Sequence, residues 1–518
     1  MPENKCAGVL MHISSLAGSP GIGDIGDSAR RFLDQLNHMR LRVWQMLPLG
    51  PAGYGDSPYQ SLSTFAGNEM LIGLEPLARQ GLLKSSELKA MNKLPASHVD
   101  YGSLHPIKSM LLDRAADRID VSDSAKSMTK FQQFRARHDP AWLDDYALFR
   151  AIKKDQGGKP WWQWPAALAK REPNALAEIR KTSQAAINRV KLQQFLFDQQ
   201  WNSLRSDAHE RGITLFGDVP IYIAHDSADA WARRELVQLD ERGRPRFVAG
   251  VPPDYFSDEG QLWGNPLYNW AEHDRDGYAW WAQRLEHALQ RFDLLRIDHF
   301  RGFESYWSVR ADHENAKQGN WEPGPGDALF EALEASLGKL PIVAENLGEI
   351  TPEVESLRKR HGLPGMVILQ FEAENPDFDA QAVDQDNVIY TGTHDNDTIR
   401  GWFQGRLNDT RTRSELRACR KRAKKLTGGT ARTITRDMIR VALQSPARLA
   451  MAPLQDFLDL GSEARMNTPG STSDNWQWRV DPALMTSQFF DSVAGMVQAC
   501  SRDPEHALQS GPGPGSLK

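Results

Sequence analysis

The sequence predicts an α/β fold, a (β/α)8 TIM barrel with large, mostly helical insertions and no C-terminal β-sandwich domain. Eight short apolar runs recur along the 518 residues, and each has the composition of a buried parallel strand. Several follow a helical stretch that closes on a glycine, the residue that most readily ends a helix in the left-handed conformation. The repeating unit is helix, glycine, strand, and eight such units form a barrel.

The predicted strands cover residues 9–14, 42–49, 213–223, 294–300, 341–347, 366–371, 387–393 and 447–454. Gly212, Gly338 and Gly362 stand shortly before the third, fifth and sixth of these runs. The segment before the third run places a set of apolar side chains on one helical face: Val190, Phe197, Trp201, Leu204 and Ala208. This spacing predicts a helix packed on the sheet.

Uneven spacing of the strands locates the insertions. Residues 50–190 separate the second strand from the third by far more than the ~30 residues of a simple βαβ unit, and they have a mostly helical pattern. Residues 224–275 are rich in Gly, Pro, Asp and aromatics, which predicts a long ordered loop region at the active site. We expect one catalytic barrel over 1–508, and a disordered Gly/Pro-rich tail over 509–518.

Composition excludes some classes of ligand. The chain has 62 Lys and Arg against 67 Asp and Glu, a net charge of −5, so it lacks the basic field that attracts nucleic acid or an anionic membrane. Three scattered cysteines and the absence of a signal-peptide pattern predict a cytoplasmic protein. There are 16 Trp against 10 Tyr, and such flat apolar faces suit either the core or sugar rings.

Carboxylates stand at the carboxyl ends of four predicted strands, where barrel enzymes place their chemistry. They are Asp218, Asp298, Glu345 and Asp395. Converging carboxylates raise the pKa of at least one of them, which yields the acid and carboxylate pair that glycoside cleavage requires. Arg296 lies two residues before Asp298, so it faces the same way and favours an ionised Asp298.

A metal or cofactor site is the competing interpretation of this rim. His12, His299 and His394 are possible ligands, but no metal-binding spacing is present. Neighbours on a regular strand, such as His394 and Asp395, are also expected to face opposite ways. A Gly-rich string at residues 21–26 lies too far from its strand, with no acid for a ribose. We predict no metal and no cofactor.

Several segments resemble the 4-α-glucanotransferases called amylomaltases or disproportionating enzymes, glycoside hydrolase family 77 of the α-amylase superfamily. The matching segments span most of the chain in order: Ser57-Pro-Tyr-Gln-Ser61, Phe216-Gly-Asp-Val-Pro220, residues 249–257, residues 260–266, Leu295-Arg-Ile-Asp-His-Phe-Arg-Gly-Phe303, Ala344-Glu-Asn-Leu-Gly348, Thr393-His-Asp-Asn396, residues 465–470 and residues 475–479. Together these segments are highly specific for this family.

The resemblance implies roles for individual residues. Asp298 would be the nucleophile, Glu345 the general acid and then base, and Asp395 the acid that binds and distorts the sugar at the cleaved bond. Arg296 and His394 would hold that sugar's hydroxyls. The remaining candidates for substrate binding are Tyr59, which would stack on the same sugar, Asp218 on the rim, Tyr255 and Trp263 on an arched loop, and Phe371.

These assignments predict a retaining 4-α-glucanotransferase that moves α-1,4-glucan segments between maltodextrins and releases glucose from small donors. Its partners would be a glucan donor and a glucose or maltooligosaccharide acceptor, with no nucleic acid and no membrane. We expect a monomer or a weak homo-oligomer. Two alternatives stay open: an α-glucan hydrolase, and a noncatalytic glucan-binding protein on a barrel scaffold.

Overall fold

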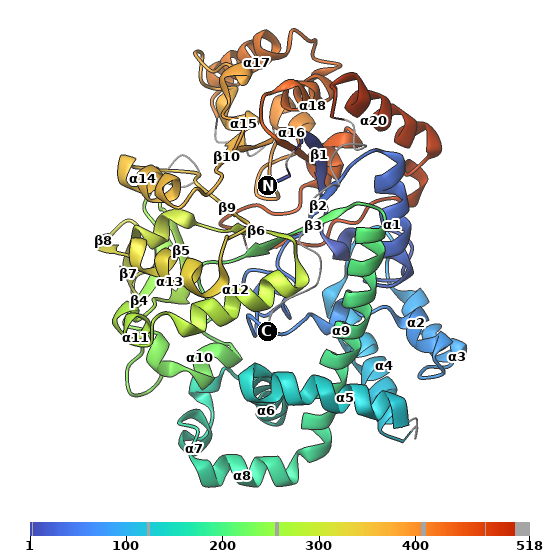
Figure 1. Cartoon of the computed structure of the whole chain (residues 1–518), viewed down its shortest axis with the longest axis vertical. Helices are drawn as coiled ribbons and strands as arrows, with labels where there is room; N and C mark the ends of the chain where they lie inside the picture. Colours follow the sequence, from blue (N-terminus) through green and yellow to red (C-terminus); the bar gives the residue numbers. More distant parts are fainter. Residues whose placement is uncertain (3, 122–124, 254–257, 406–410, 472, 503–518) are drawn as a thin grey trace.

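Eight parallel strands form the centre of the computed structural model (Figure 1), which describes residues 1–2, 4–121, 125–253, 258–405, 411–471 and 473–502. The strands are β1 (Cys6–Leu10), β2 (Val43–Gln45), β3 (Thr214–Val219), β6 (Leu294–Ile297), β9 (Ile342–Ala344), β10 (Met366–Ile368), β11 (Val388–Tyr390) and β12 (Leu449–Pro453). Their order in the sheet is β10-β11-β12-β1-β2-β3-β6-β9. This is chain order wrapped into a ring, and the prediction of a (β/α)8 barrel is confirmed.

All eight predicted strands are present. Seven lie within the predicted ranges and are shorter, whereas the first is shifted and covers Cys6–Leu10 in place of 9–14. Residues 13–15 and 369–372 are helical turns, the 3-10 turn Ile13–Ser15 and the short helix α15 (Leu369–Glu372). Phe371 therefore lies on a helix and not on a strand. The physical reason is that apolar residues continue past the ladder to pack the loops, and composition alone does not mark where pairing stops.

The inside of the barrel has an apolar layer with a more polar layer above it. Phe216, Leu294 and Val343 belong to one buried cluster with apolar side chains of the other strands. Side chains two positions further along a strand face the same way, so the layer above contains Asp218, Arg296 and Glu345. The polar groups of the site therefore lie on a layer of buried apolar side chains.

Helices surround the sheet. Those that follow or precede barrel strands are α1 (Asp27–His38), α9 (Gln184–Glu210), α12 (Ala279–Arg291), α13 (Asp327–Leu337), α14 (Pro352–Arg360), α16 (Ile399–Gln404), α17 (Arg413–Thr427), α18 (Ile434–Gln444), α19 (Leu454–Phe457) and α20 (Ser487–Ala499). Helix α9 buries Phe197, Trp201 and Leu204 as its spacing predicts. Gly212, with φ 65°, turns the chain from α9 into β3.

Residues 50–190 contribute helices along the lower and right edges of Figure 1. These are α2 (Leu74–Arg79), α3 (Ser85–Leu88), α4 (Tyr101–Val121), α5 (Ala125–His138), α6 (Asp144–Asp155), α7 (Ala166–Ala169) and α8 (Pro173–Thr182). Helix α9 packs against α4 and α6, which ties this region to the barrel. None of the helices in the described part of the chain combines the length and apolar character needed to cross a bilayer.

Residues 224–275 differ from the long loop that the sequence predicts. They form α10 (Ala228–Ala232), α11 (Trp270–Arg275) and two strands, β4 (Phe247–Val251) and β5 (Gln261–Pro266). With β7 (Ser305–Arg310) and β8 (Gly319–Pro323) these strands make an antiparallel sheet in the order β5-β4-β7-β8. Strand β4 pairs with a segment far downstream, and short-range sequence patterns do not reveal such a partner.

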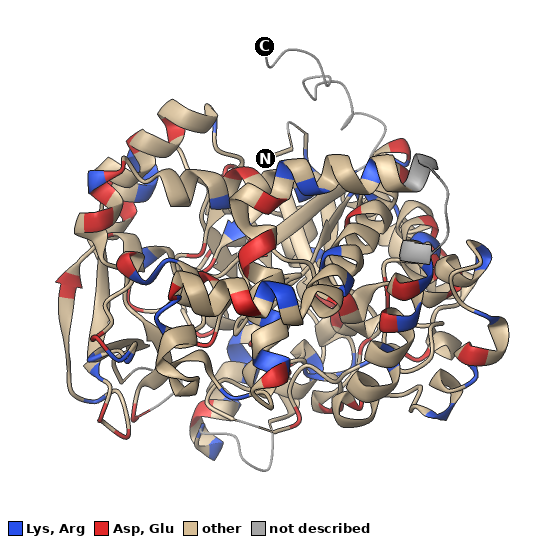
Figure 2. Ribbon diagram, turned by 90° about the horizontal axis from the view of Figure 1, so that it is seen from below, with Lys and Arg blue, Asp and Glu red and all other residues tan. Residues whose placement is uncertain are grey.

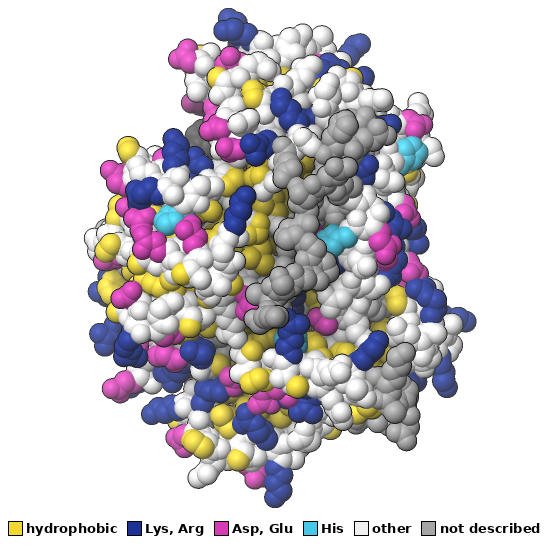
Figure 3. Space-filling view, in the orientation of Figure 1, with side chains coloured by type: hydrophobic (Ala, Val, Ile, Leu, Met, Phe, Trp, Pro, Cys, Tyr) yellow, Lys and Arg dark blue, Asp and Glu magenta, His cyan; other side chains and the backbone are white. Residues whose placement is uncertain are grey.

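Charged side chains are interspersed by sign over the ribbon and over the face drawn in space-filling form (Figures 2 and 3). This agrees with the near balance of acidic and basic residues in the sequence. The tail predicted over 509–518 lies outside the described residues.

Arg502, the last described residue, is completely buried at the start of β1 and β12. Its guanidinium donates to the carbonyl oxygens of Cys6 (2.9 Å), Ala447 (2.8 Å) and Ser445 (3.0 Å), and Nε donates to that of Leu443 (2.5 Å). One cation thus ties carbonyl groups before β12 to the first residue of β1. The carbonyl of Ser445 also accepts from Lys5 at 3.1 Å.

We expect Arg502→Leu to destabilise the fold by at least about 3 kcal/mol, because it removes several charge-assisted hydrogen bonds to buried carbonyl groups at once. Urea denaturation followed by tryptophan fluorescence measures this loss. The control is Arg440→Leu, which removes an arginine of α18 whose side chain is 41% exposed; its effect should stay below about 1 kcal/mol. Equal midpoints for the two variants would contradict the assigned role of Arg502.

Candidate active site

Three of the four predicted acids come from neighbouring strands of the barrel, and the fourth comes from a separate strand. Asp218 lies near the end of β3, Asp298 directly follows β6, and Glu345 directly follows β9. Strands β3, β6 and β9 are adjacent in the sheet. Asp395 lies in the turn after β11, on the other side of the ring. Their common position at the carboxyl ends of parallel strands brings the acids to one end of the barrel.

Arg296 joins two of these acids. Its Nη1 donates to both oxygens of Asp218, at 2.9 and 2.8 Å, and its Nη2 lies 2.7 Å from Oδ1 of Asp298. The side chains of Arg296 and Asp218 are almost fully buried, whereas that of Asp298 is 26% exposed. Arg296 and Asp298 face the same way, as the two-residue period of a strand predicts. Asp298 is therefore an ion-paired carboxylate that still faces solvent.

Backbone groups fix the Glu345 carboxyl group next to Asp298. Oε2 accepts from the N–H of His299 at 2.7 Å, and Oε1 accepts from the N–H of Leu347 at 2.8 Å. His299, the residue after Asp298, has φ 50°, a left-handed conformation that is costly for a side chain other than glycine. A strained conformation at this position directs a peptide N–H toward the carboxyl group.

Burial raises the pKa of Glu345 to about 7. Arg296 opposes this rise, the negative charge of Asp298 adds to it, and the two peptide N–H groups lower the pKa again. Burial also raises the pKa of Asp218, against the opposing charge of Arg296. The site thus pairs a carboxyl group that can carry a proton near neutral pH with an ion-paired carboxylate.

Tyr59 connects the loop after β2 to the acids. Its hydroxyl donates to Oδ2 of Asp218 at 2.7 Å, and the charges of Asp298 and Asp395 also act on it. Its ring stacks on His394, with centroids 5.2 Å apart and an interplanar angle of 15°. Tyr59 and His394, two of the predicted binding residues, are therefore in contact with each other.

Asp395 and His394 depart from the expected geometry. Nε2 of His394 lies 3.4 Å from Oδ2 of Asp395, so the two side chains meet. The expectation that they face opposite ways is wrong, because β11 ends at Tyr390 and the alternation of a strand does not continue into the turn. Asp395 Oδ1 also accepts from Nδ2 of Asn467 at 2.6 Å, and its backbone carbonyl accepts from Arg465 at 2.5 Å.

Asn467 and Arg465 are site residues that the sequence prediction did not select. Their segment, residues 465–470, was the only signal, since it is one of the stretches that resemble the family. No local pattern says that an amide more than 70 positions away along the chain fixes Asp395.

Of the remaining predicted residues, Trp263 on β5 lies near the acids. Its ring meets that of His299 edge to face, with centroids 4.8 Å apart. The amide of Gln60 joins Tyr59's loop to the same strand by donating to Asn265 at 3.0 Å. Phe371 is half-buried and packs against the apolar cluster inside the barrel. Tyr255 lies outside the described residues.

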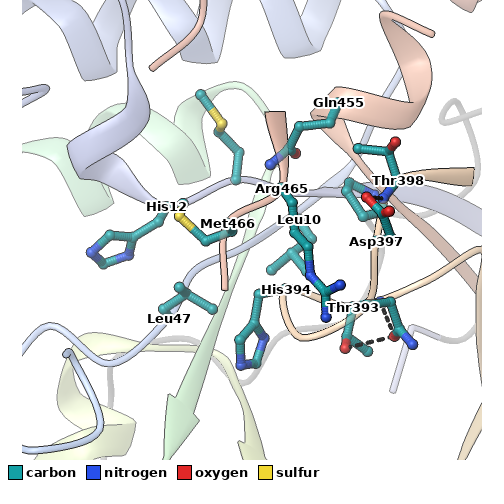
Figure 4. A pocket seen from close by; sticks show the side chains of 13 residues that line it. Leu10, His12, Leu47, Thr393, His394, Asp397, Thr398, Gln455, Arg465 and Met466 are labelled. Carbon is teal, nitrogen blue, oxygen red and sulfur yellow. Dashed lines mark hydrogen bonds between the residues drawn. The ribbon is translucent and has the colours of Figure 1, made fainter. Parts of the chain in front are cut away.

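A pocket opens beside His394, between the ends of β1, β11 and β12 (Figure 4). His12, Thr393, Gln455 and Arg465 contribute to its lining. Burial lowers the pKa of His12 to about 3, so this imidazole is uncharged near neutral pH. Within the described ranges, no three His, Cys, Asp or Glu side chains are grouped as a metal site.

The chain is similar to known proteins over most of its length. A family model described as 4-alpha-glucanotransferase matches residues 11–485. The chain is 45% identical to a 4-alpha-glucanotransferase of Thermus thermophilus over 96% of this chain and 99% of the relative. It is 42% identical to the chloroplastic/amyloplastic 4-alpha-glucanotransferase of Solanum tuberosum, over 95% and 84%. An amylomaltase from Streptococcus agalactiae in complex with acarbose has a TM-score of 0.91 and 35% identity, over 96% of this chain and 100% of that one.

We expect Glu345 to titrate near pH 7, because burial disfavours its charged form. Infrared difference spectra across pH 5–9 follow its protonated carboxyl band, and the band should be missing in Glu345→Gln. Arg296→Met should move the midpoint to higher pH, since it removes the cation that lowers this pKa. A midpoint near pH 4.5 in the parent, or a downward move in Arg296→Met, would contradict this account.

Proposed function

The chain belongs to the 4-alpha-glucanotransferase family, and we propose that it acts by a retaining double displacement on α-1,4-linked glucans. The observation that carries this mechanism is the pairing of two carboxyl groups in different states. Asp298 is ion-paired with Arg296, and the pKa of the adjacent Glu345 is raised to about 7. A retaining glycosidase needs one carboxylate nucleophile and one protonated acid beside it.

In the first step, Asp298 attacks the anomeric carbon of the donor glucan. The glycosidic C–O bond breaks, and Glu345 gives its proton to the departing oxygen. The products are a glucosyl ester of Asp298 and a free glucan or glucose. Glu345 is then ionised, and the ester has removed the negative charge of Asp298 that had raised the pKa of Glu345.

In the second step, the 4-hydroxyl of another glucan attacks the same carbon. Glu345 takes the hydroxyl proton, the new C–O bond forms, and the bond to Asp298 breaks. Both residues return to their starting states, and two inversions leave the α configuration unchanged. Small donors such as maltotriose would release glucose in the first step.

The contacts around the acids support roles in holding the sugar at the cleaved bond. Asp395, fixed by Asn467 and close to His394, presents a carboxylate that is 42% exposed. Together with His394 it can bind the sugar hydroxyls and favour the distorted ring of the transition state. Tyr59, already oriented by Asp218 and His394, would stack on the same sugar. Trp263, whose ring meets that of His299, would contact the bound glucan.

The competing function is hydrolysis, in which water opens the ester instead of a sugar hydroxyl. Both reactions use the same acids, so the balance depends on how well the acceptor is held and water is excluded. The family to which the chain belongs favours transfer.

With maltotriose as the only substrate, we expect a ladder of longer oligosaccharides together with free glucose. Transfer conserves the number of glycosidic bonds, so the molar sum of reducing ends stays constant as the ladder grows. Chromatography of the products with a reducing-end assay measures both quantities. Maltose and glucose without longer chains, and with rising reducing ends, would identify a hydrolase.

Asp298→Asn should lower turnover of maltotriose by at least about a thousand-fold, because the amide cannot form the ester intermediate. Asp293→Asn is the matched control. Asp293 lies just before the same strand, at its opposite end, where it accepts from the N–H of Leu215. The control should retain most of the activity. An Asp298→Asn protein that works at the parent rate would place the nucleophile elsewhere. A parent protein that binds glucans without converting them would favour the noncatalytic glucan-binding role.

A further inference from the structure

The strand ladder of the barrel is incomplete between β9 and β10, next to the proposed acid. These two strands are the ends of the eight-stranded order. One backbone bond of a parallel pair is present, from the N–H of Ala344 to the carbonyl of Pro364 at 2.8 Å. In a regular ladder the N–H of Met366 would donate to the carbonyl of Ala344. It donates instead to Oδ1 of Asn346, at 2.7 Å.

Asn346 thus replaces a backbone group at this seam, and it is the residue directly after Glu345. The other half of its amide donates to Oε1 of Glu355 on α14, at 2.8 Å. Glu355 is itself held by Arg358, whose Nη2 lies 2.7 Å from Oε2. Arg358 donates in turn to the carbonyl of Leu363 at 2.6 Å, just before β10. The hydrogen bonds form a closed circuit around the seam.

Gly365 provides the space for this amide. A Cβ atom on Gly365 would lie 2.9 Å from both Nδ2 and Oδ1 of Asn346, closer than real Cβ contacts occur. The backbone of Gly365 is not left-handed, so space, and not conformation, is what requires glycine here. Gly365 and Glu355 therefore hold the Asn346 side chain from two sides.

The consequence for the acid follows from the turn that Asn346 occupies. Oε1 of Glu345 accepts from the N–H of Leu347, so the carboxyl group is oriented by a turn with Asn346 at its centre. The Glu345 backbone is fixed on its other side by the carbonyl of Ile297, at 3.0 Å. The N–H of Phe300 donates to the carbonyl of Glu345 at 3.1 Å, and the N–H of His299 holds Oε2. If the Asn346 amide were released, these contacts would remain, but the turn that carries the N–H of Leu347 would lose its side-chain anchor.

We propose that Asn346 is a positioning residue for Glu345, with Gly365 as the socket that holds it. The inference rests on the proposed function, in which Glu345 protonates the leaving oxygen. Asn346 acts through the loop and does not touch the reacting atoms. Its substitution should therefore affect bond cleavage when the leaving group needs a proton, and have little effect when it does not.

The experiment compares two donors, maltotriose and α-maltosyl fluoride, because fluoride leaves without help from an acid. In Asn346→Leu, which keeps the volume but has no amide, we expect kcat/KM for maltotriose to fall by about ten- to a hundred-fold. The value for the fluoride should fall by less than about three-fold. Gly365→Ala adds a Cβ that would displace the same amide, so it should give the same difference between the two donors. If one of the two variants does not fold, the other still tests the inference. The double variant should be no worse than the poorer single variant.

Asn387→Ala is the matched control, because the Asn387 side chain accepts from the N–H of Gly365 at 3.0 Å but lies before β11, away from Glu345. This variant should lower kcat/KM for both donors by the same factor, or leave both values unchanged. The inference is overturned if Asn346→Leu slows the two donors equally or leaves both unchanged. The proposed function fails separately, if the parent does not extend maltotriose at all.

A second readout is the pH profile of kcat/KM for maltotriose. The N–H of Leu347 lowers the pKa of Glu345, so loss of this bond raises that pKa. The first step needs protonated Glu345, and its ionisation sets the alkaline limb of the profile. We expect that limb to move to higher pH in Asn346→Leu. A limb that stays in place or moves to lower pH would contradict the role.

Discussion

The buried Arg296 guanidinium, between Asp218 and Asp298, is the contact on which the chemistry of the site depends. A buried cation needs anionic partners. Both carboxylate oxygens of Asp218 accept from Arg296, and the Asp218 side chain is itself inaccessible to solvent. Asp298 completes the pairing from the exposed side. The same cation lowers the pKa of Glu345, but burial raises it by more, so the pKa of Glu345 stays raised. Arg296 is thus paired with Asp298, whereas burial raises the pKa of the neighbouring Glu345.

The barrel makes this arrangement possible because each strand contributes one position to each layer. Phe216, Leu294 and Val343 form part of the floor, and the residues two positions on are Asp218, Arg296 and Glu345. The floor keeps water from the underside of the charged layer and strengthens its electrostatics. Loops from remote parts of the chain then complete the site from above, among them those with Tyr59 and Asn467.

The strands and the acids could be predicted from the sequence because both leave local marks. Buried parallel strands are compact apolar runs, and Asp298 and Glu345 stand directly after two of them. Family-like segments added Tyr59 and His394, which the structure places in contact. What remained hidden depends on distant partners: β4 needs β7 to become a strand, and Asn467 gains its role by meeting Asp395. The turn after β11 also removed the alternation assumed for His394 and Asp395.

The contacts between β9 and β10 could not be predicted from the sequence either. Asn346 and Gly365 look like ordinary loop residues until their amide and missing Cβ are seen to fit together. The central claim, that Asp298 is the nucleophile which Arg296 keeps paired, is tested most directly by trapping the ester. After reaction with a 5-fluoro-α-glucosyl fluoride, peptide mass spectrometry should find one fluoroglucosyl group, attached to Asp298. A label on Asp218, Glu345 or Asp395, or no label in a protein that turns over maltotriose, would contradict the account.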